Sequence, residues 1–171
     1  MKKGEIYEGI IEKVDFPNKG YVCIDDQKVL IKNGIPGQKV RFMIQKKRSG
    51  RAQGRILEVL EKSPFETRDA VCNNFPACGG CMYQTMSYEN QLVMKETQIR
   101  ELLEEALVRG GQVDKNGQAD FDWEGIHGSP IEFGYRNKME FSFGDEYKDG
   151  PLSLGLHKKG STYDVLTASD C

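Results

Sequence analysis

Three cysteines lie within ten residues of each other, in the order Cys72-x5-Cys78-x2-Cys81. Thiolates at this spacing can bind one soft metal centre, and the Gly-Gly pair before the third lets the backbone turn tightly. A fourth ligand must come from elsewhere in the chain. Cys23 lies in a short apolar run typical of a buried strand, which leaves Cys171. We therefore predict a four-cysteine metal site made of Cys72, Cys78, Cys81 and Cys171.

The spacing of these cysteines favours an iron–sulfur cluster. Structural zinc sites usually combine two Cys-x2–4-Cys pairs, whereas three neighbouring cysteines and one remote cysteine are closer to a cluster-type arrangement. Zinc and free thiols stay open as alternatives. The chain has five cysteines and no apolar leader after Met1, which argues against a disulfide framework and a secretory precursor. We therefore expect a reducing, cytoplasmic environment.

Basic residues gather in the first part of the chain. Residues 1–62 hold 14 Lys and Arg against 8 Asp and Glu, and residues 63–171 hold 10 against 18. A basic segment beside an acidic one indicates an anionic partner, and nucleic acid is the commonest. The most basic loop is too polar for a core, so we predict phosphate contacts for Lys46, Lys47, Arg48 and Arg51.

A second candidate for RNA contact lies in the Tyr-Arg-Asn-Lys segment, where Arg136 and Lys138 stand among apolar neighbours. Such cations can bind RNA phosphate or a displaced base. The alternative is that both point to solvent while the apolar neighbours face the core.

The patterning predicts how these residues are positioned. Residues 1–62 contain five short runs of strand-forming residues separated by turn signals, with no helix, which fits a small all-β barrel of the oligonucleotide-binding (OB) kind. Val40, Phe42 and Ile44 alternate with polar or exposed positions, so one face of that strand is expected to be buried.

Residues 63–171 are predicted to form an α+β domain with one main helix and an antiparallel sheet. The helix has Ser87 as its N-cap and ends at Gly110, with an apolar face and a favourable pair of Glu96 with Arg100. Residues 112–130 are expected to be a loop. Strands return from Ile131 onward, including one over 139–143, as an antiparallel meander packed on the helix.

These motifs in this order carry a family resemblance. A basic barrel, Cys-x5-Cys-Gly-Gly-Cys, a helix, the segment 134–138, the segment 154–161 and a final Asp-Cys follow one another along the whole chain. Their combination resembles the N-terminal part of an RNA (uracil-5-)-methyltransferase of the 23S rRNA type. Residues 1–62 resemble the TRAM domain of that family, and residues 63–171 its iron–sulfur-binding central domain.

The resemblance implies a cofactor set and a partner. The four matching cysteines would hold a [4Fe-4S] cluster, and the barrel would bind RNA, with rRNA expected ahead of tRNA. S-adenosylmethionine and the cysteine nucleophile would belong to a separate C-terminal domain, to which a flipped uridine is presented. No glycine-rich cofactor motif and no Pro-Cys nucleophile segment occurs here, so no catalytic or cofactor-binding residue is assigned. DNA is not expected as a partner. A membrane is not expected either, because no apolar run approaches the roughly 18 residues of a span.

Other functions compete with this interpretation. A stand-alone RNA-binding module with a structural four-cysteine metal site needs only that the chain ends at Cys171. Radical S-adenosylmethionine enzymes use Cys-x3-Cys-x2-Cys, and the x5 spacing argues against them. A further alternative is a zinc-stabilised adaptor, which metal analysis would distinguish from an iron–sulfur protein.

Overall fold

The computed structural model of the chain describes residues 1–48, 50–169 and 171, and within β5 it describes the backbone but not the side chain of Arg48. The chain forms two compact units. The first unit combines Met1–Glu66 with Ser87–Gly128, and the second combines Thr67–Met86 with Ser129–Cys171. Each unit is therefore built from two separate stretches of sequence.

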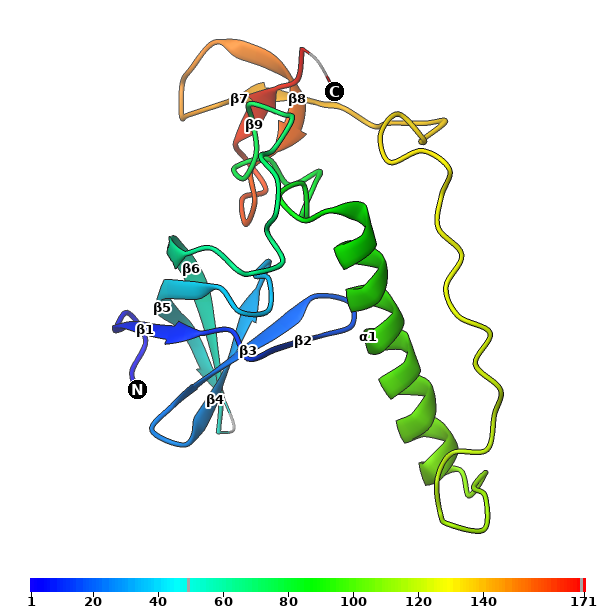
Figure 1. The fold of residues 1–171 in the computed structure, drawn as a ribbon. Coiled ribbons are helices and arrows are strands. Elements are labelled where there is room, and N and C mark those ends of the chain that lie inside the picture. Colours follow the sequence, from blue (N-terminus) through cyan, green and yellow to red (C-terminus); the bar gives the residue numbers. More distant parts are fainter. Residues whose placement is uncertain (49, 170) are drawn as a thin grey trace. The chain divides into compact units, whose positions relative to one another are not determined.

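The first unit contains a six-stranded sheet (Figure 1). Its strands run in the spatial order β1-β5-β6-β4-β3-β2, and neighbours are antiparallel except β4 and β6, which are parallel. The strand bounds are β1 (Ile6–Ile10), β2 (Lys13–Asp15), β3 (Lys19–Ile24), β4 (Gln27–Lys32), β5 (Lys39–Arg48) and β6 (Arg51–Glu61).

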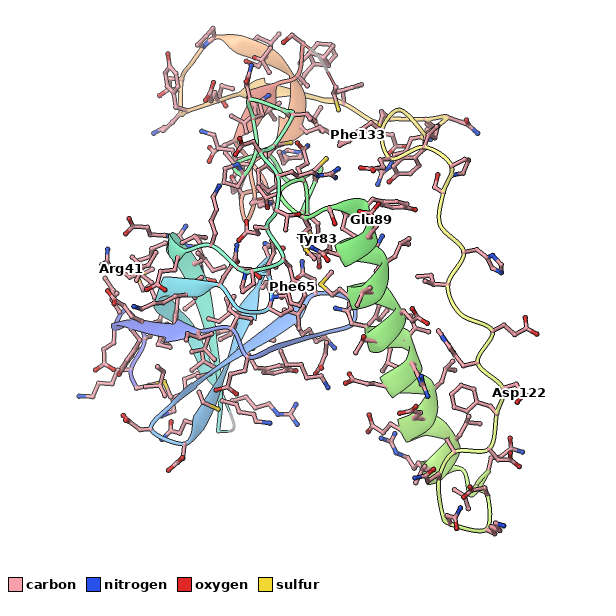
Figure 2. The ribbon with its side chains drawn as sticks, viewed as in Figure 1. Arg41, Phe65, Tyr83, Glu89, Asp122 and Phe133 are labelled. Atoms are coloured by element: carbon pink, nitrogen blue, oxygen red, sulfur yellow. The ribbon has the colours of Figure 1, made fainter. Side chains whose placement is uncertain are left out.

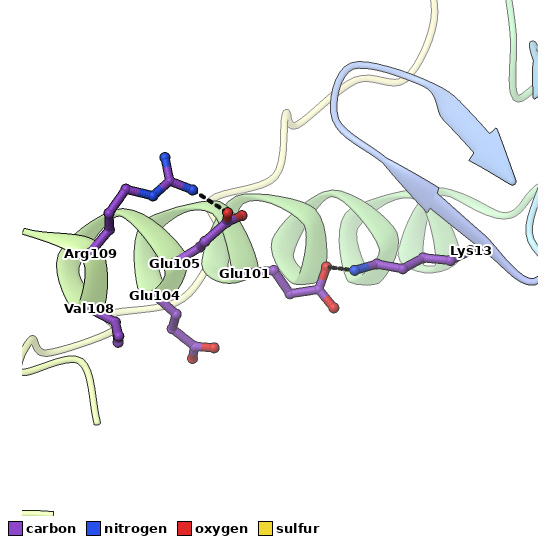
Figure 3. A pocket seen from close by; sticks show the side chains of 6 residues that line it. All are labelled: Lys13, Glu101, Glu104, Glu105, Val108 and Arg109. Carbon is purple, nitrogen blue, oxygen red and sulfur yellow. Dashed lines mark hydrogen bonds and ion pairs between the residues drawn. The ribbon is translucent and has the colours of Figure 1, made fainter. Parts of the chain in front are cut away.

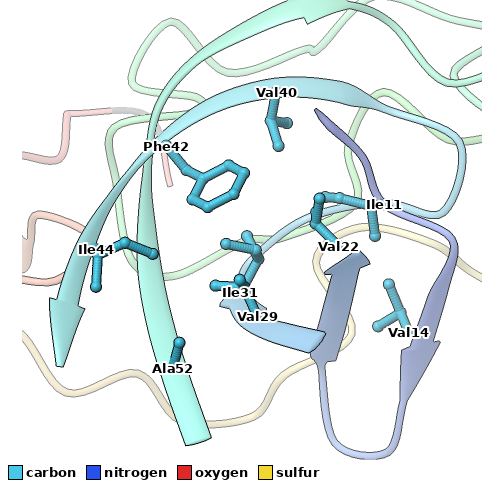
Figure 4. Packing of buried hydrophobic residues seen from close by; sticks show 9 residues of the cluster. All are labelled: Ile11, Val14, Val22, Val29, Ile31, Val40, Phe42, Ile44 and Ala52. Atoms are coloured by element: carbon cyan, nitrogen blue, oxygen red, sulfur yellow. The ribbon is translucent and has the colours of Figure 1, made fainter. Parts of the chain in front are cut away.

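The core of this unit lies against one face of the sheet. The predicted alternation in β5 is confirmed, because Val40, Phe42 and Ile44 are all fully buried. Gly54 on β6 faces Phe42 so closely that an added Cβ would stand 2.7 Å from its ring. Close packing of this kind leaves no room for a larger residue. Figure 4 shows the buried cluster, whose members are Ile11, Val14, Val22, Val29, Ile31, Val40, Phe42, Ile44 and Ala52.

The strand count differs from the prediction at the start of the chain. Five short strands were expected in residues 1–62, and the structure has six, because the first apolar run forms both β1 and β2, separated by Ile11 and Glu12. The N–H of the buried Ile11 donates at 2.9 Å to the carbonyl of Gln38, the residue that precedes β5. The next N–H, that of Glu12, donates instead to Tyr21 on β3 at 3.0 Å. The chain thus passes from one end strand of the sheet to the other, and the described strand ladder does not by itself close a barrel.

The main helix, α1 (Tyr88–Arg109), has the predicted ends. Ser87 caps it by accepting a hydrogen bond from the Asn90 N–H at 3.2 Å, which satisfies one of the free donors of the first turn. The N–H of Gly110 donates to the Ala106 carbonyl at the other end. Both the N-cap and the terminating glycine of the prediction are confirmed.

The unit to which α1 belongs differs from the expectation. Residues 63–171 were expected to form one domain with the helix packed on its sheet, but α1 is part of the first unit. The buried Gln98 side chain donates to the Val14 carbonyl at 2.7 Å, and Glu101 pairs with Lys13 at 2.8 Å. Figure 3 shows the second of these contacts. These polar contacts attach α1 to β2. The periodicity of hydrophobic residues does not predict contacts of this kind.

The apolar face expected on α1 is only partly covered. Leu102 and Leu103 are 44% and 41% exposed, and Gln98 is the buried residue of the helix. The pairing of Glu96 with Arg100 is wrong. Arg100 instead pairs with Glu104 at 2.9 Å, while Glu96 accepts a 2.6 Å hydrogen bond from the Trp123 indole. The helix is therefore held by its polar as much as by its apolar side chains.

The second unit contains a three-stranded antiparallel sheet, β7 (Ser142–Asp145), β8 (Leu152–His157) and β9 (Val165–Thr167), in that spatial order. The predicted meander is confirmed, although its first strand begins at Ser142 and not at residue 139. Val165 and Leu166 on β9 are buried. Residues 110–141 form no helix or strand beyond a single bridge of Val113 with Ala119, as Figure 1 shows. No described helix is both long and apolar enough to cross a membrane.

Candidate functional site

The three neighbouring cysteines lie on a loop of the second unit that its own backbone folds tightly. The Phe75 N–H donates to the Cys72 carbonyl at 3.0 Å, and the Cys78 N–H donates to the Asn74 carbonyl at 2.8 Å. The Cys72 N–H donates to the Gln84 side chain at 3.2 Å. The turn formers between the cysteines thus make consecutive turns that bring the chain back on itself.

The last part of this loop pairs with the end of β8. Cys78 and Lys158 form an antiparallel bridge, and the Gly79 N–H donates to the His157 carbonyl at 2.8 Å. A Cβ added to Gly79 would stand 2.9 Å from that carbonyl oxygen, so only glycine fits here without a shift of backbone. The neighbouring Gly80 N–H donates to the Cys78 sulfur at 3.3 Å. Backbone N–H bonds to sulfur are among the contacts that tune iron–sulfur clusters.

Cys171 comes near the same loop from the other end of the chain. Desolvation raises the pKa of the Cys171 thiol, and the negative charges of Cys81, Cys78 and Cys72 raise it further, while Arg136 opposes them. Cys171 therefore lies within electrostatic range of the three cysteines of the loop. None of them is in a disulfide. Cys23, by contrast, belongs to the first unit and is exposed on β3, so the prediction that it is a core residue is wrong.

The four thiols fit a soft metal centre by their chemistry. They are free, two are half-buried and two exposed, and one sulfur already accepts a backbone hydrogen bond. Thiolates of this kind select zinc or an iron–sulfur cluster. In the described part of the chain, no three His, Cys, Asp or Glu side chains are arranged around one point as metal ligands are.

The basic loop lies at the tip of the β5–β6 hairpin. Lys46, Lys47 and Arg51 are exposed, as a phosphate contact requires, and the side chain of Arg48 lies outside the described part. Lys46 faces Gln53 and Lys47 faces Ala52 across the hairpin, so the two lysines project from opposite faces. The Lys47 ammonium donates to the Met1 carbonyl at 3.2 Å.

Arg136 and Lys138 lie in the second unit, on an irregular segment and not on a strand. Both are exposed. Lys138 pairs with Glu140 at 2.6 Å, and the Arg136 guanidinium contacts the Met139 sulfur at 3.8 Å. The structure thus describes the two predicted sets of RNA-contacting cations in different units.

Sequence reasoning gave little weight to Lys159, which the structure places beside the cysteine loop. Its ammonium lies 4.9 Å from the centre of the Phe75 ring. Desolvation lowers the pKa of the Lys159 amine, and the charges of Cys78 and Cys81 partly oppose that shift. A Lys-Lys-Gly turn after a strand is the signal that could have pointed to it.

A second cation of this unit, Arg68, also lies over an aromatic ring. Its guanidinium is 5.6 Å from the centre of the Phe133 ring and pairs with Glu132 at 2.6 Å. Figure 2 marks the position of Phe133.

A shallow hollow on α1, in the first unit, is lined mainly by acidic side chains. Figure 3 shows its lining, in which Glu101 is paired with Lys13 and Glu105 with Arg109. The full lining is Lys13, Glu101, Glu104, Glu105, Val108 and Arg109. Its carboxylates outnumber its cations, so it does not suit a polyanion.

Comparisons with known proteins match the chain to proteins named RNA methyltransferases. It is 43% identical over 171 residues to an uncharacterized RNA methyltransferase of Clostridium tetani, and equally identical over the same length to one of Caldanaerobacter subterraneus. A third such protein, from Clostridium acetobutylicum, is 37% identical over 171 residues. The matches cover 100% of this chain and 35% of each relative, so the chain spans about a third of their length.

A similar fold occurs among solved structures. One example is the crystal structure of Pyrococcus abyssi tRNA (uracil-54, C5)-methyltransferase in complex with S-adenosyl-L-homocysteine. The superposition has a TM-score of 0.56 and covers 96% of this chain and 32% of that one, at 18% identity. At that identity the likeness concerns the fold alone. No family model matches the chain.

Proposed function

We propose that this chain is the RNA-binding and [4Fe-4S]-binding portion of an S-adenosylmethionine-dependent enzyme that methylates C5 of a uridine in RNA. The observation that carries the proposal is the similarity over all 171 residues to proteins named RNA methyltransferases, of which the chain spans about a third. The site chemistry agrees with a supporting role in such an enzyme, since it offers metal ligands and phosphate-binding cations.

The cluster is proposed to sit between the loop 72–81 and the chain near residue 171. Four free thiols support this assignment: Cys171 interacts electrostatically with the three cysteines of the loop, and the Cys78 sulfur accepts a backbone hydrogen bond. When bound, a [4Fe-4S] cluster supplies a rigid four-point crosslink. Cys72, Cys78, Cys81 and Cys171 would hold it, and the backbone bridge to Lys158 would fix the loop for ligation. We assign it a structural and RNA-docking role.

Residues 1–62 are proposed to be a TRAM-like barrel that binds RNA. The passage of the chain from one end strand to the other through the buried Ile11 supports the closure of an OB-like barrel. The exposed Lys46, Lys47 and Arg51 at the β5–β6 tip support phosphate binding. Each neutralised phosphate releases counterions, which is the usual source of affinity for RNA. Arg136 and Lys138 are proposed as further RNA contacts from the second unit.

The catalytic residues and the S-adenosylmethionine site are proposed to lie in a part of the enzyme that this chain does not contain. We favour 23S rRNA over tRNA as the substrate, on the resemblance of the motifs, and the cytoplasm as the compartment.

Two measurements test the proposal. Anaerobically prepared chain is expected to carry about four irons and four sulfides per molecule, and replacement of Cys78 by Ser should abolish them; zinc in stoichiometric amount would contradict the cluster. Deletion of the gene is expected to remove one 5-methyluridine from rRNA, mapped by mass spectrometry. Its loss from tRNA alone would contradict the rRNA substrate, and an unchanged set of 5-methyluridines would contradict the methyltransferase itself.

A further inference from the structure

The backbone around Lys159 is fixed directly beside the predicted metal loop. The Lys159 N–H donates to the Ala77 carbonyl at 2.8 Å, one residue before Cys78. Two residues earlier, the His157 carbonyl accepts from Gly79 at 2.8 Å. These two bonds form a short antiparallel pair between the loop and the end of β8. The backbone of Lys159 is therefore held next to the cysteine loop.

The side chain of Lys159 is then held by an aromatic ring of the same loop. Its ammonium lies 4.9 Å from the centre of Phe75, which stands between Cys72 and Cys78 in the sequence. A cation over the face of a ring is attracted by the negative charge of the ring face, and more strongly when it is desolvated. Lys159 is half-buried, and it interacts electrostatically with Cys78 and Cys81.

The adjacent lysine has a different environment. The Lys158 ammonium donates to the Glu146 backbone carbonyl at 2.7 Å and stands 3.9 Å from the Glu146 carboxylate. Its charge is therefore balanced by a carboxylate, whereas the Lys159 ammonium lies over an aromatic ring and interacts electrostatically with Cys78 and Cys81. The two neighbours share size, charge and hairpin, which makes Lys158 a matched control.

We propose that Lys159 is the charge partner of the four-cysteine centre: its ammonium, held by Phe75, balances the negative charge of the metal-bound thiolates of Cys78 and Cys81. This inference rests on the proposed metal site and deepens it. A nearby cation lowers the electrostatic cost of gathering several anionic sulfur atoms around one centre. It also favours any added electron, because the net charge around a cluster sets its reduction potential together with solvent exposure and hydrogen bonds to sulfur.

The test compares Lys159→Met and Lys158→Met with the unchanged chain after anaerobic reconstitution with iron and sulfide. Iron release to a chelator is expected to be several-fold faster in Lys159→Met and unchanged in Lys158→Met. In a one-electron titration with dithionite as reductant, Lys159→Met is expected to have a more negative potential, with about 59 mV for each tenfold loss in the reduction equilibrium. Lys159→Arg, which keeps the charge, is expected to restore both properties.

The outcomes separate this inference from the proposed metal site. If the unchanged chain binds iron and sulfide but Lys159→Met matches it in iron release and potential, the role of Lys159 is overturned and the four-cysteine site stands. If both lysine variants change alike, the effect is one of general surface charge and the inference also fails. If the unchanged chain takes up neither iron nor zinc, the site itself fails, and Lys159 with it. Circular dichroism of the metal-free proteins identifies a variant that has lost its fold. If Lys159→Met is such a variant, Lys159→Arg is compared with the unchanged chain, and a changed iron release or potential in a folded Lys159→Arg contradicts the role of the charge.

Discussion

The side-chain amide of Gln98 on α1 donates a 2.7 Å hydrogen bond to the backbone carbonyl of Val14 on β2, and Gln98 is only 7% exposed. This one bond joins residues 84 positions apart in the sequence. It ties α1, which follows the cysteine loop in the chain, to the unit formed by the first six strands.

Replacement of Gln98 by Leu is expected to lower the free energy of unfolding by about 1–3 kcal/mol, because a buried carbonyl loses its donor. Urea denaturation followed by circular dichroism measures this change. Glu101→Gln, which removes the exposed ion pair to Lys13, is the control and is expected to cost at most about 1 kcal/mol. Equal effects of the two substitutions would contradict the special role of the buried bond.

The core of the first unit gives a second prediction. Phe42 is fully buried, and its Ala variant is expected to lose about 3–5 kcal/mol of unfolding free energy through lost contacts and a cavity. Leu57→Ala is the control, because Leu57 is 43% exposed on β6 and should cost far less. A loss of under about 1 kcal/mol for the Phe42 variant would mean that the described packing is wrong.

The cysteine loop depends on Gly79. In Gly79→Ala the new methyl group would stand 2.9 Å from the His157 carbonyl oxygen, so the loop must move away from β8. We expect the variant to bind less metal, measured as iron per chain after reconstitution. Gly110→Ala lies at the end of α1 with a negative φ and should bind as much metal as the unchanged chain. Full metal binding by Gly79→Ala would show that the backbone bridge to β8 does not position the ligands.

Local signals in the sequence were sufficient for several of these features. Alternating apolar residues predicted the buried face of β5, and Ser87 with Gly110 predicted both ends of α1, because each rests on contacts within a few residues. The four cysteines could be chosen by type and spacing, and they stay a prediction as metal ligands.

Long-range polar contacts were beyond the same reasoning. Nothing in the pattern around Gln98 indicates a bond to Val14, and the apolar stripe of α1 suggested a different neighbour. The misplacement of Cys23 has a similar cause: a strand in an apolar run can still turn alternate residues to solvent. Lys159 was overlooked because a lysine near a turn is usually solvated, and only the three-dimensional approach of Phe75 distinguishes it.

Tyr83 predicts how stability changes in alkali. Burial raises the pKa of its hydroxyl to about 12 from an ordinary value of 10.0. Above pH 10 the unfolded chain loses this proton while the folded chain keeps it, so the free energy of unfolding is expected to fall between pH 10 and pH 12. Tyr83→Phe removes the ionisable group and should make the fall shallower. Urea denaturation across this range measures it, and parallel curves for both proteins would contradict the buried hydroxyl; Figure 2 marks the residue.

The basic hairpin tip gives the most direct prediction on RNA. Lys46→Ala and Arg51→Ala are each expected to weaken binding of an RNA oligonucleotide and to reduce the slope of log affinity against log salt by about 1, because each removes one phosphate contact. The matched control is Lys39→Ala, on the same strand, whose ammonium is already paired with Glu61 at 2.7 Å. Fluorescence anisotropy over a range of salt concentrations measures the slopes. Arg41 is paired with both Glu8 and Glu58, so Arg41→Ala is likewise expected to leave the affinity for RNA and its salt dependence unchanged. A smaller slope for the Lys39 and Arg41 variants than for the Lys46 and Arg51 variants would place the RNA contact on the side of the sheet and not at its tip.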